Sequence, residues 1–166
     1  PPAKLFDATT TEDWRSAIDL NLMSTVFLAR AVLPAMKARG WGRFLAITSI
    51  SVKEPIGSLV LSNSVRSAVS ALLKTLSDEY AAHGVTVNNL CPGYTATDRL
   101  RELSSALARS GDVTIAEVEK RWTERIPAGR LGTPEEFANL VVFLASERAG
   151  YITGTSIAVD GGLVRS

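Results

Sequence analysis

Phe44–Ile47 is an unbroken apolar run, and it narrows the choice of folds more than any other segment. A strand that faces water on one side alternates apolar and polar residues, whereas a strand covered on both faces is apolar throughout. The run is short and leads into the polar pair Thr48–Ser49. It therefore predicts a strand of a parallel sheet that is buried on both faces. Because so apolar a strand is unsuited to a sheet edge, we expect another strand to pair with it.

Helical spacing of apolar residues predicts three long helices. The first follows the N-cap candidates Thr9–Thr11, is kinked at Pro34 and is stopped by Gly40. The second spans Leu61–Ala82, before Gly84. Its inward side chains are expected to be Ala68, Leu72, Leu73 and Leu76. The third begins at Thr133–Glu136, where an N-cap Thr, a Pro and a Glu occupy the positions of a capping box. Its inward side chains are expected to be Phe137, Leu140, Val141 and Leu144.

Two more strands are predicted, at Val85–Cys91 and Thr155–Val159. A polar, helix-rich insertion lies between the two, in which Leu100, Leu103 and Leu107 suit one short helix. Thr114 and Glu117 have the spacing of a capping box for a second short helix. Alternation of helix and strand is typical of an α/β fold with a parallel sheet. The sequence thus predicts an α/β domain with about three parallel strands flanked by helices.

Composition excludes several classes of protein. With 166 residues, the chain has the length of a single domain. The 18 Lys and Arg residues nearly balance the 17 Asp and Glu residues, so no excess charge indicates nucleic acid or membrane phosphate as a partner. One His and the single Cys91 make a structural metal site and an intrachain disulfide improbable. Because no uninterrupted apolar run approaches about 20 residues, we expect a cytoplasmic protein without a membrane span.

Polar residues follow each predicted strand, at the edge where α/β proteins bind ligands. They lie in the segments 48–51, 91–97 and 160–162. Asn21 is a further candidate, because its amide interrupts an apolar helix face. Each of these features alone fits a turn or a local hydrogen bond better than a functional site.

In combination, the ordered motifs resemble the short-chain dehydrogenase/reductase family. The motifs are Asn21, Ile47–Ser49, Val87–Gly93 with Thr97, Gly129–Glu136, Tyr151–Gly154 and Val159–Gly162. The resemblance covers essentially the whole chain, and the tail is especially similar to that of bacterial 3-oxoacyl-carrier-protein reductases. It implies a Rossmann-type fold and an NADP- or NAD-dependent oxidoreductase that acts on a small carbonyl/alcohol pair, with a 3-oxoacyl thioester as one candidate.

The resemblance also implies roles for particular residues. Asn21 matches an Asn of a proton relay, and Ser49 matches the Ser that binds the substrate carbonyl. The segment that lies against the nicotinamide corresponds to Pro92, Gly93, Thr95 and Thr97. Residues 99–130 correspond to a substrate lid, whose leucines indicate an apolar substrate. The two long helices correspond to a subunit interface, which implies a homodimer or homotetramer.

The chain departs from the family at the Tyr-x-x-x-Lys motif, where it has Ser62 and Arg66. A serine hydroxyl is a much poorer proton donor than a phenol, and an arginine stays protonated and cannot relay a proton. Arg66 can still contact ribose hydroxyls and supply positive charge. Tyr94, just after Pro92–Gly93, is a candidate for a replacement acid. The alternative for Tyr94 is a loop aromatic that packs against the lid.

The family's glycine-rich phosphate-binding turn has no counterpart in this sequence. We therefore expect the 166 residues to be the C-terminal part of a longer Rossmann domain, with little cofactor binding or activity alone. Two functions stay open at this point. The retained Asn21, Ser49 and Pro92–Gly93 favour an oxidoreductase with an atypical site. The changes at positions 62 and 66 favour a non-catalytic relative that acts through nucleotide binding or subunit assembly.

Overall fold

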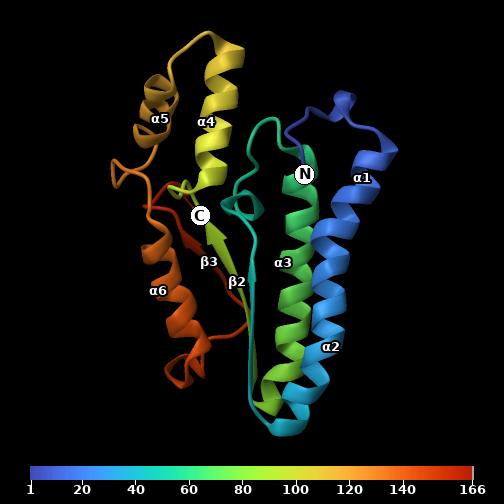
Figure 1. Cartoon of the computed structure of the whole chain (residues 1–166). Helices are drawn as coiled ribbons and strands as arrows, with labels where there is room; N and C mark the ends of the chain where they lie inside the picture. The colour runs from blue at the N-terminus through green and yellow to red at the C-terminus, as the bar shows by residue number, and fades with distance from the viewer. Residues whose placement is uncertain (166) are drawn as a thin grey trace.

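Three parallel strands form the single sheet of the computed structural model, which describes residues 1–165 apart from the side chain of Ser110 (Figure 1). The strands are β1 (Gly42–Ile47), β2 (Val85–Pro92) and β3 (Ser156–Val159), in the order β1-β2-β3. Gly42 pairs with Val85 in the first ladder, and Asn89 pairs with Ser156 in the second. The predicted α/β class with three parallel strands is confirmed.

The helices cover both faces of the sheet (Figure 1). Helices α2 (Ser24–Arg39) and α3 (Val60–Tyr80) pack on one face, where Val85 and Val87 of β2 are fully buried. Helix α6 (Pro134–Ala145) packs on the other face, over Leu90 of β2. Alternate residues of a strand point to opposite faces, so β2 presents apolar side chains to both helix layers, together with the buried polar residues Thr86, Asn88 and Asn89.

The first predicted helix is continuous but not uniformly α-helical. A 3₁₀ turn (η1, Phe6–Ala8) precedes α1 (Thr11–Ala17), which is capped by a reciprocal pair of bonds between Thr10 and Asp13. A π-helical segment, η2 (Ile18–Met23), then joins α1 to α2. Gly40, with a φ of 71°, ends α2 as expected. Pro34 lies inside α2, and the kink there stays a prediction.

The helical stretch Thr11–Arg39 has 29 residues and a mean hydropathy of 1.4 in its most apolar window. By length and composition it could cross a membrane. Helices that pack in a protein core share these properties. Here Ala17, Ala29 and Leu33 are buried against α3 and the sheet.

The second helix has only part of the inward face that was expected, since Leu73 is buried and Leu76 packs against the same core. Leu61, Val65, Val69 and Leu73 are buried, together with Ser77, whereas Ala68 is exposed. The inward face expected through Ala68 and Leu72 is therefore rotated by about one residue from the observed one. The prediction favoured these two residues over the β-branched Val65 and Val69. A 3₁₀ turn (η4, Ala81–His83) follows α3, and Gly84 ends it with a φ of 73°.

The segment predicted to be a substrate lid, called the lid below, contains a hairpin of α4 (Asp98–Gly111) and α5 (Ile115–Thr123). It has a small core of its own in which Ala108, Val118 and Trp122 are buried. The capping boxes predicted at Thr114 and Thr133 are both present, with Glu117 and Glu136 as partners. Two further 3₁₀ turns complete the helical elements, η3 (Ile50–Val52) and η5 (Glu147–Ala149).

Strand β1 is an edge strand among residues 1–165, so it is packed on both faces as predicted but is only partly buried. Phe44, Leu45 and Ala46 are half-buried, and Ile47 is 57% exposed. The reason is topological, because β1 pairs only with β2 and no other described strand lies along its outer side. Central β2, by contrast, is buried from Val85 to Cys91.

Candidate active site at the carboxyl ends of the strands

Thr48 is held in three directions at the end of β1. Its backbone N–H donates to the Leu90 carbonyl at 2.9 Å. Its hydroxyl donates to Oδ1 of Asn89 at 2.7 Å, and its carbonyl accepts from Arg66 at 3.0 Å. Buried polar groups with all their partners made are rigid, so the position of the next residue, Ser49, is well defined.

Ser49 itself begins the turn η3. Its Oγ accepts a hydrogen bond from the backbone N–H of Ser51 at 3.1 Å. The hydroxyl hydrogen of Ser49 is then available for another acceptor. Among residues 1–165, the Ser51 hydroxyl is buried without a hydrogen-bond partner, which is uncommon in a folded protein.

Ser62 and Arg66 lie one helical turn apart on α3, on the same face. Nε of Arg66 donates to Oγ of Ser62 at 3.1 Å, while Nη1 of Arg66 reaches the Thr48 carbonyl. Burial lowers the pKa of the Arg66 guanidinium, although arginine stays protonated in proteins. Among the described residues, Arg66 has no ion-pair partner. The pair therefore forms a fixed positive group beside the end of β1.

Asn21 lies in the π-helical segment η2, a kind of irregularity that is frequent at functional sites. Its amide Nδ2 donates to the Ala17 carbonyl at 3.0 Å, as expected for a mid-helix Asn with a local role. Asn21, Thr48 and Arg66 also line one cavity of about 530 Å³ between α2, α3 and β1. The structure thus brings Asn21 and Arg66 to the same cavity.

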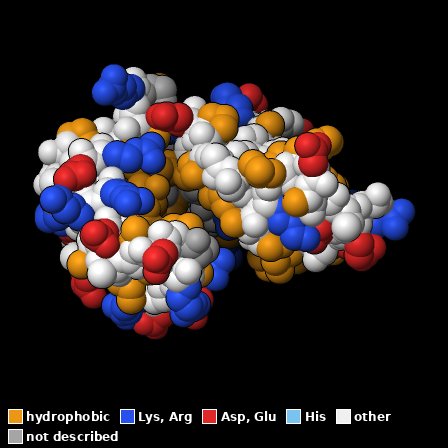
Figure 2. All heavy atoms as spheres, turned by 90° about the horizontal axis from the view of Figure 1, so that it is seen from above, with side chains coloured by type: hydrophobic (Ala, Val, Ile, Leu, Met, Phe, Trp, Pro, Cys, Tyr) orange, Lys and Arg blue, Asp and Glu red, His pale blue; other side chains and the backbone are white. Residues whose placement is uncertain are grey.

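A second cavity of about 380 Å³ lies beyond β2, between the lid and α6. Four residues predicted to contact a cofactor line it: Pro92, Gly93, Thr95 and Thr97. Leu100, Leu103 and Phe137 make the rest of its wall largely apolar. Figure 2 looks onto the lid end of the molecule and shows apolar side chains in the hollow between its two lobes.

The close approach of two strand ends explains why residue 93 is a glycine. A Cβ at this position would lie 2.7 Å from Cβ of Asp160, closer than side chains pack. The Gly93 N–H also donates to the Val159 carbonyl at 3.0 Å. The ends of β2 and β3 can therefore approach each other only with glycine here.

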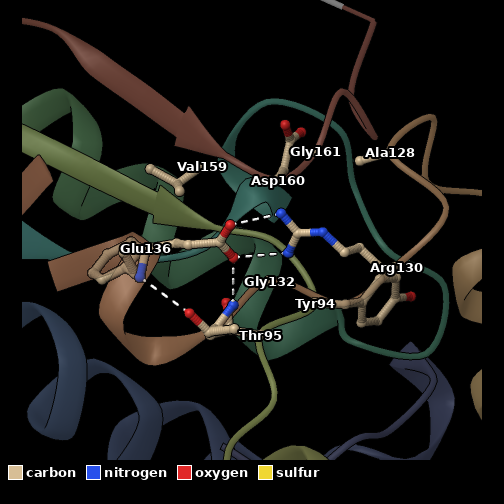
Figure 3. Close-up of a pocket in the computed structure, with 11 residues that line it drawn as sticks. Tyr94, Thr95, Ala128, Arg130, Gly132, Glu136, Val159, Asp160 and Gly161 are labelled. Atoms are coloured by element: carbon tan, nitrogen blue, oxygen red, sulfur yellow. Dashed lines mark hydrogen bonds and ion pairs between the residues drawn. The ribbon is translucent and has the colours of Figure 1, made fainter. Parts of the chain in front are cut away.

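Tyr94 packs against the lid. Its ring stacks on Trp122 with the centroids 5.1 Å apart and the planes at 12°. Tyr94 also borders a small cavity of about 150 Å³, in which Arg130 and Glu136 form a two-bond ion pair (Figure 3). In that view the Tyr94 hydroxyl points away from the ion pair. The Tyr94 ring therefore packs against the lid, as the alternative interpretation expected. A role for Tyr94 as the acid stays a prediction.

Sequence reasoning missed three of these contributors. Trp122 is the only aromatic residue of the lid and follows Val118 at helical spacing, a signal that could have identified it. The Arg130–Glu136 pair and the bond from Thr48 to Asn89 depend on chain folding and leave no local pattern. In residues 1–165, no three His, Cys, Asp or Glu side chains lie together in a way that could hold a metal ion.

A family model described as enoyl-(acyl carrier protein) reductase matches residues 2–164. The chain belongs to the short-chain dehydrogenase/reductase family. It is 36% identical to the acetoacetyl-CoA reductase of Rhizobium meliloti (strain 1021) over 95% of this chain and 61% of that protein. It is also 36% identical to the 3-oxoacyl-(acyl-carrier-protein) reductase of Escherichia coli (strain K12), over 92% of this chain and 58% of that one.

Solved structures of the short-chain dehydrogenase/reductase family share the fold. YwfH, an NADPH-dependent reductase involved in bacilysin biosynthesis, has a TM-score of 0.92 at 31% identity, over 98% of this chain and 63% of YwfH. L-sorbose reductase from Gluconobacter frateurii, complexed with NADPH and L-sorbose, has a TM-score of 0.92 at 30% identity, over 99% of this chain and 63% of the reductase. The chain spans 56–61% of the length of the curated relatives that it matches.

Proposed function

We propose that this chain serves an NADP- or NAD-dependent oxidoreductase that interconverts a carbonyl and an alcohol in a small substrate. The observation that carries the proposal is the cavity beyond β2, because Pro92, Gly93, Thr95 and Thr97 line it together. Membership of the short-chain dehydrogenase/reductase family supports it, as do the NADPH-dependent YwfH and the L-sorbose reductase that was solved with NADPH bound.

The lining of this cavity fits the nicotinamide end of the cofactor. A flat ring needs apolar walls, which Ile47, Leu100 and Phe137 provide, and its carboxamide needs polar partners, which Thr95 and Thr97 provide. When bound, the cofactor supplies or accepts the hydride. The protein's part is to orient the substrate and to stabilise charge on its oxygen.

We assign these tasks to the residues around Thr48. Ser49 donates its hydroxyl hydrogen to the substrate oxygen. Ser62 and Arg66 place a hydrogen-bond donor and a fixed positive charge nearby, which stabilises negative charge on that oxygen. Asn21 faces the same cavity as Arg66 and orders solvent there. Because Arg66 holds its proton, the proton for the oxygen comes from Tyr94 or from water.

Relatives suggest candidate substrates, and exposed apolar side chains suggest an assembly. Those named acetoacetyl-CoA reductase and 3-oxoacyl-(acyl-carrier-protein) reductase make 3-oxoacyl thioesters one candidate class. Residues 99–130 would form the substrate lid. Three apolar side chains on the helical stretch 18–39 are more than half exposed, which suits a homodimer or homotetramer through α2 and α3: Leu20, Phe27 and Leu28. A cytoplasmic location is part of the same proposal.

The test separates cofactor binding from catalysis. NADPH fluorescence is titrated with the longer protein that is expected to contain this chain, unmodified or carrying Thr95→Val, which removes one cavity hydroxyl; Thr75→Val on the exposed side of α3 is the matched control. Weaker binding by Thr95→Val alone supports the nicotinamide site. Equal binding by both variants, or none by the unmodified longer protein, contradicts it.

Turnover is then measured over a panel of ketones and 3-oxoacyl thioesters. A loss of turnover in Tyr94→Phe but not in Ser62→Ala would identify Tyr94 as the acid. Cofactor binding without turnover of any of these compounds would contradict the enzyme proposal for them, and would favour a non-catalytic relative.

A further inference from the structure

A series of buried hydrogen bonds runs from the end of β1 across the sheet to α3. The Thr48 hydroxyl donates to Oδ1 of Asn89 at 2.7 Å, and Nδ2 of Asn89 donates to Oγ of Ser156 at 3.1 Å. Oγ of Ser156 in turn lies 2.9 Å from Oγ of Ser70, so these two hydroxyls are hydrogen-bonded. Thr48 is 7% exposed and Asn89 is 1% exposed. The bond between Thr48 and Asn89 is therefore protected from water, and satisfied polar groups in such surroundings are rigid.

The order of donors and acceptors at Thr48 follows from the chemistry of its partners. An amide oxygen can only accept, so the single hydroxyl hydrogen of Thr48 is used by Asn89. The Cys91 sulfur lies 3.6 Å from Oγ1 of Thr48, and its S–H group is therefore the donor in that contact. Burial raises the pKa of the Cys91 thiol, although a hydrogen bond from the Ser49 backbone lowers it in part, so the thiol keeps its hydrogen at neutral pH. The Thr48 hydroxyl thus has one partner that accepts from it and one that donates to it.

Ser49 is tied to this series through the backbone of Thr48. The Thr48 carbonyl accepts from Arg66 at 3.0 Å, which holds the peptide plane that leads into Ser49. The Thr48 side chain is held by Asn89, and its backbone N–H is held by the Leu90 carbonyl at 2.9 Å. If the bond to Asn89 is lost, Thr48 can turn about its backbone, and the peptide plane turns with it. The direction of the Ser49 hydroxyl therefore depends on an amide in the next strand.

We propose that Asn89 is a positioning residue of the active site, and that it acts on the reaction through the direction of the Ser49 hydroxyl. The inference rests on the proposed function, in which Ser49 donates this hydrogen to the substrate oxygen. Asn89 itself lines neither the cavity beyond β2 nor the cavity beside Arg66, so it acts through Thr48. A hydrogen-bond donor stabilises a transition state only while it points at the oxygen on which charge develops. Small displacements of such a donor therefore slow the reaction.

The preceding residue of β2 offers a matched comparison. Asn88 is also 1% exposed, and its Nδ2 donates to the Ile152 carbonyl at 2.8 Å while its Oδ1 accepts from Oγ1 of Thr155 at 3.1 Å. Successive residues of a strand point to opposite faces, so this amide lies on the α6 side of the sheet. Asn88 and Asn89 thus share a residue type, a strand and a degree of burial. They differ in whether their hydrogen bonds lead to Thr48.

The test introduces Asn89→Leu and Asn88→Leu into the longer protein that is expected to contain this chain. Leucine is close to asparagine in size and shape but its side chain makes no hydrogen bonds, so each variant loses the bonds of one amide. We expect both variants to lower the midpoint of urea unfolding. In NADPH-dependent turnover of the ketones and thioesters, kcat should fall about tenfold in Asn89→Leu and less than about twofold in Asn88→Leu. In a Ser49→Ala background, Asn89→Leu should lower kcat by less than about twofold, because no hydroxyl is left to misplace.

A second measurement needs no turnover. The S–H stretching band of Cys91, isolated in the infrared as the difference from Cys91→Ala, reports the bond that this thiol makes to Thr48. Asn89→Leu should shift this band and the amide resonance of Ser49, whereas Asn88→Leu should shift neither. Thr48→Val, which removes only the hydroxyl, should also shift the band and lower kcat, and it replaces Asn89→Leu if that variant does not fold.

Two results would overturn the assignment of Asn89. One is a Cys91 band and a Ser49 resonance that stay unchanged in Asn89→Leu. The other is a loss of kcat in Asn89→Leu that is equally large with and without Ser49→Ala, because the amide would then act on the fold as a whole. An unmodified protein without turnover would contradict the proposed function, and the two spectra then decide on their own whether Asn89 orients Ser49.

Discussion

Arg66 donates a hydrogen bond from Nη1 to the carbonyl oxygen of Thr48 at 3.0 Å, and this bond joins α3 to the residue that precedes Ser49. Thr48 is gripped on its other side by Asn89, which in turn donates from Nδ2 to Oγ of Ser156 at 3.1 Å. The position of Ser49 therefore depends on α3 and on both neighbouring strands. An arginine at position 66 has a structural task in this chain whatever its part in chemistry.

Substitution of Arg66 should test that task. Arg66→Ala removes both bonds and leaves the Thr48 carbonyl without this partner, at an expected cost of about 1–3 kcal/mol in the free energy of unfolding. Arg66→Lys keeps the charge, but a single ammonium cannot reproduce the geometry of the guanidinium, so only partial recovery is expected. Urea unfolding measures both. Lys74→Ala, which removes an exposed ion pair on the same helix, should cost less than about 0.5 kcal/mol. Equal losses in the free energy of unfolding for Arg66→Ala and Lys74→Ala would contradict this structural role of Arg66.

Gly84 and Gly40 make a matched pair for a second prediction. Both have left-handed φ angles, 73° and 71° respectively, so an alanine strains the backbone at either position by about 1–2 kcal/mol. A Cβ at Gly84 would also lie 2.2 Å from the Gly40 carbonyl oxygen, whereas a Cβ at Gly40 has no neighbour within 4 Å. Gly84→Ala should therefore destabilise the protein by about 1–3 kcal/mol more than Gly40→Ala in thermal or urea unfolding. Equal stabilities of Gly84→Ala and Gly40→Ala would contradict the predicted steric overlap at Gly84.

Glu136 should stabilise the folded protein, and this contribution should be lost at acidic pH. The Arg130 guanidinium, with a backbone bond from Thr133, lowers the Glu136 pKa from 4.5 to about 2. A carboxylate whose pKa is lower in the folded state stabilises it above the unfolded pKa, and that contribution is lost as pH falls from about 4.5 towards 2.

Glu136→Gln should flatten the fall of the melting temperature between pH 4.5 and 2. The neighbouring Glu135→Gln should keep the slope of the unmodified chain. Asp13, whose pKa is also about 2 because of Lys4 and Thr10, contributes a similar fall in both variants. A slope that is unchanged in Glu136→Gln would show that its ion pair is not maintained in solution.

Features set by neighbouring residues were predictable, whereas those set by folding were not. The caps at Thr114 and Thr133 depend on residues three positions away, and both were found. The π-helical segment around Asn21 has no sequence signal of its own, and the exposure of Ile47 depends on which strands pair with β1. The sequence shows that residue 66 is an arginine, but its hydrogen-bond partner Thr48 lies 18 residues away and could not be predicted. The family motif located Ser49 and Gly93, while the geometry around them had to come from the structure.

The stack of Tyr94 on Trp122 provides the last prediction, because it is the main ring contact between the lid and the loop after β2. Trp122 is 8% exposed and lies in the lid's own core, so Trp122→Ala removes a large buried side chain. We expect amide hydrogen exchange to accelerate throughout α4 and α5 while β2 stays protected, since the lid core is separate from the core beneath the sheet. Trp41→Ala is the control, because Trp41 is 40% exposed and stacks on Arg39 and Arg43 away from the lid. If Trp122→Ala instead accelerates exchange equally in β2 and α4, the lid and the sheet unfold as one unit, and Tyr94 is held by the whole domain.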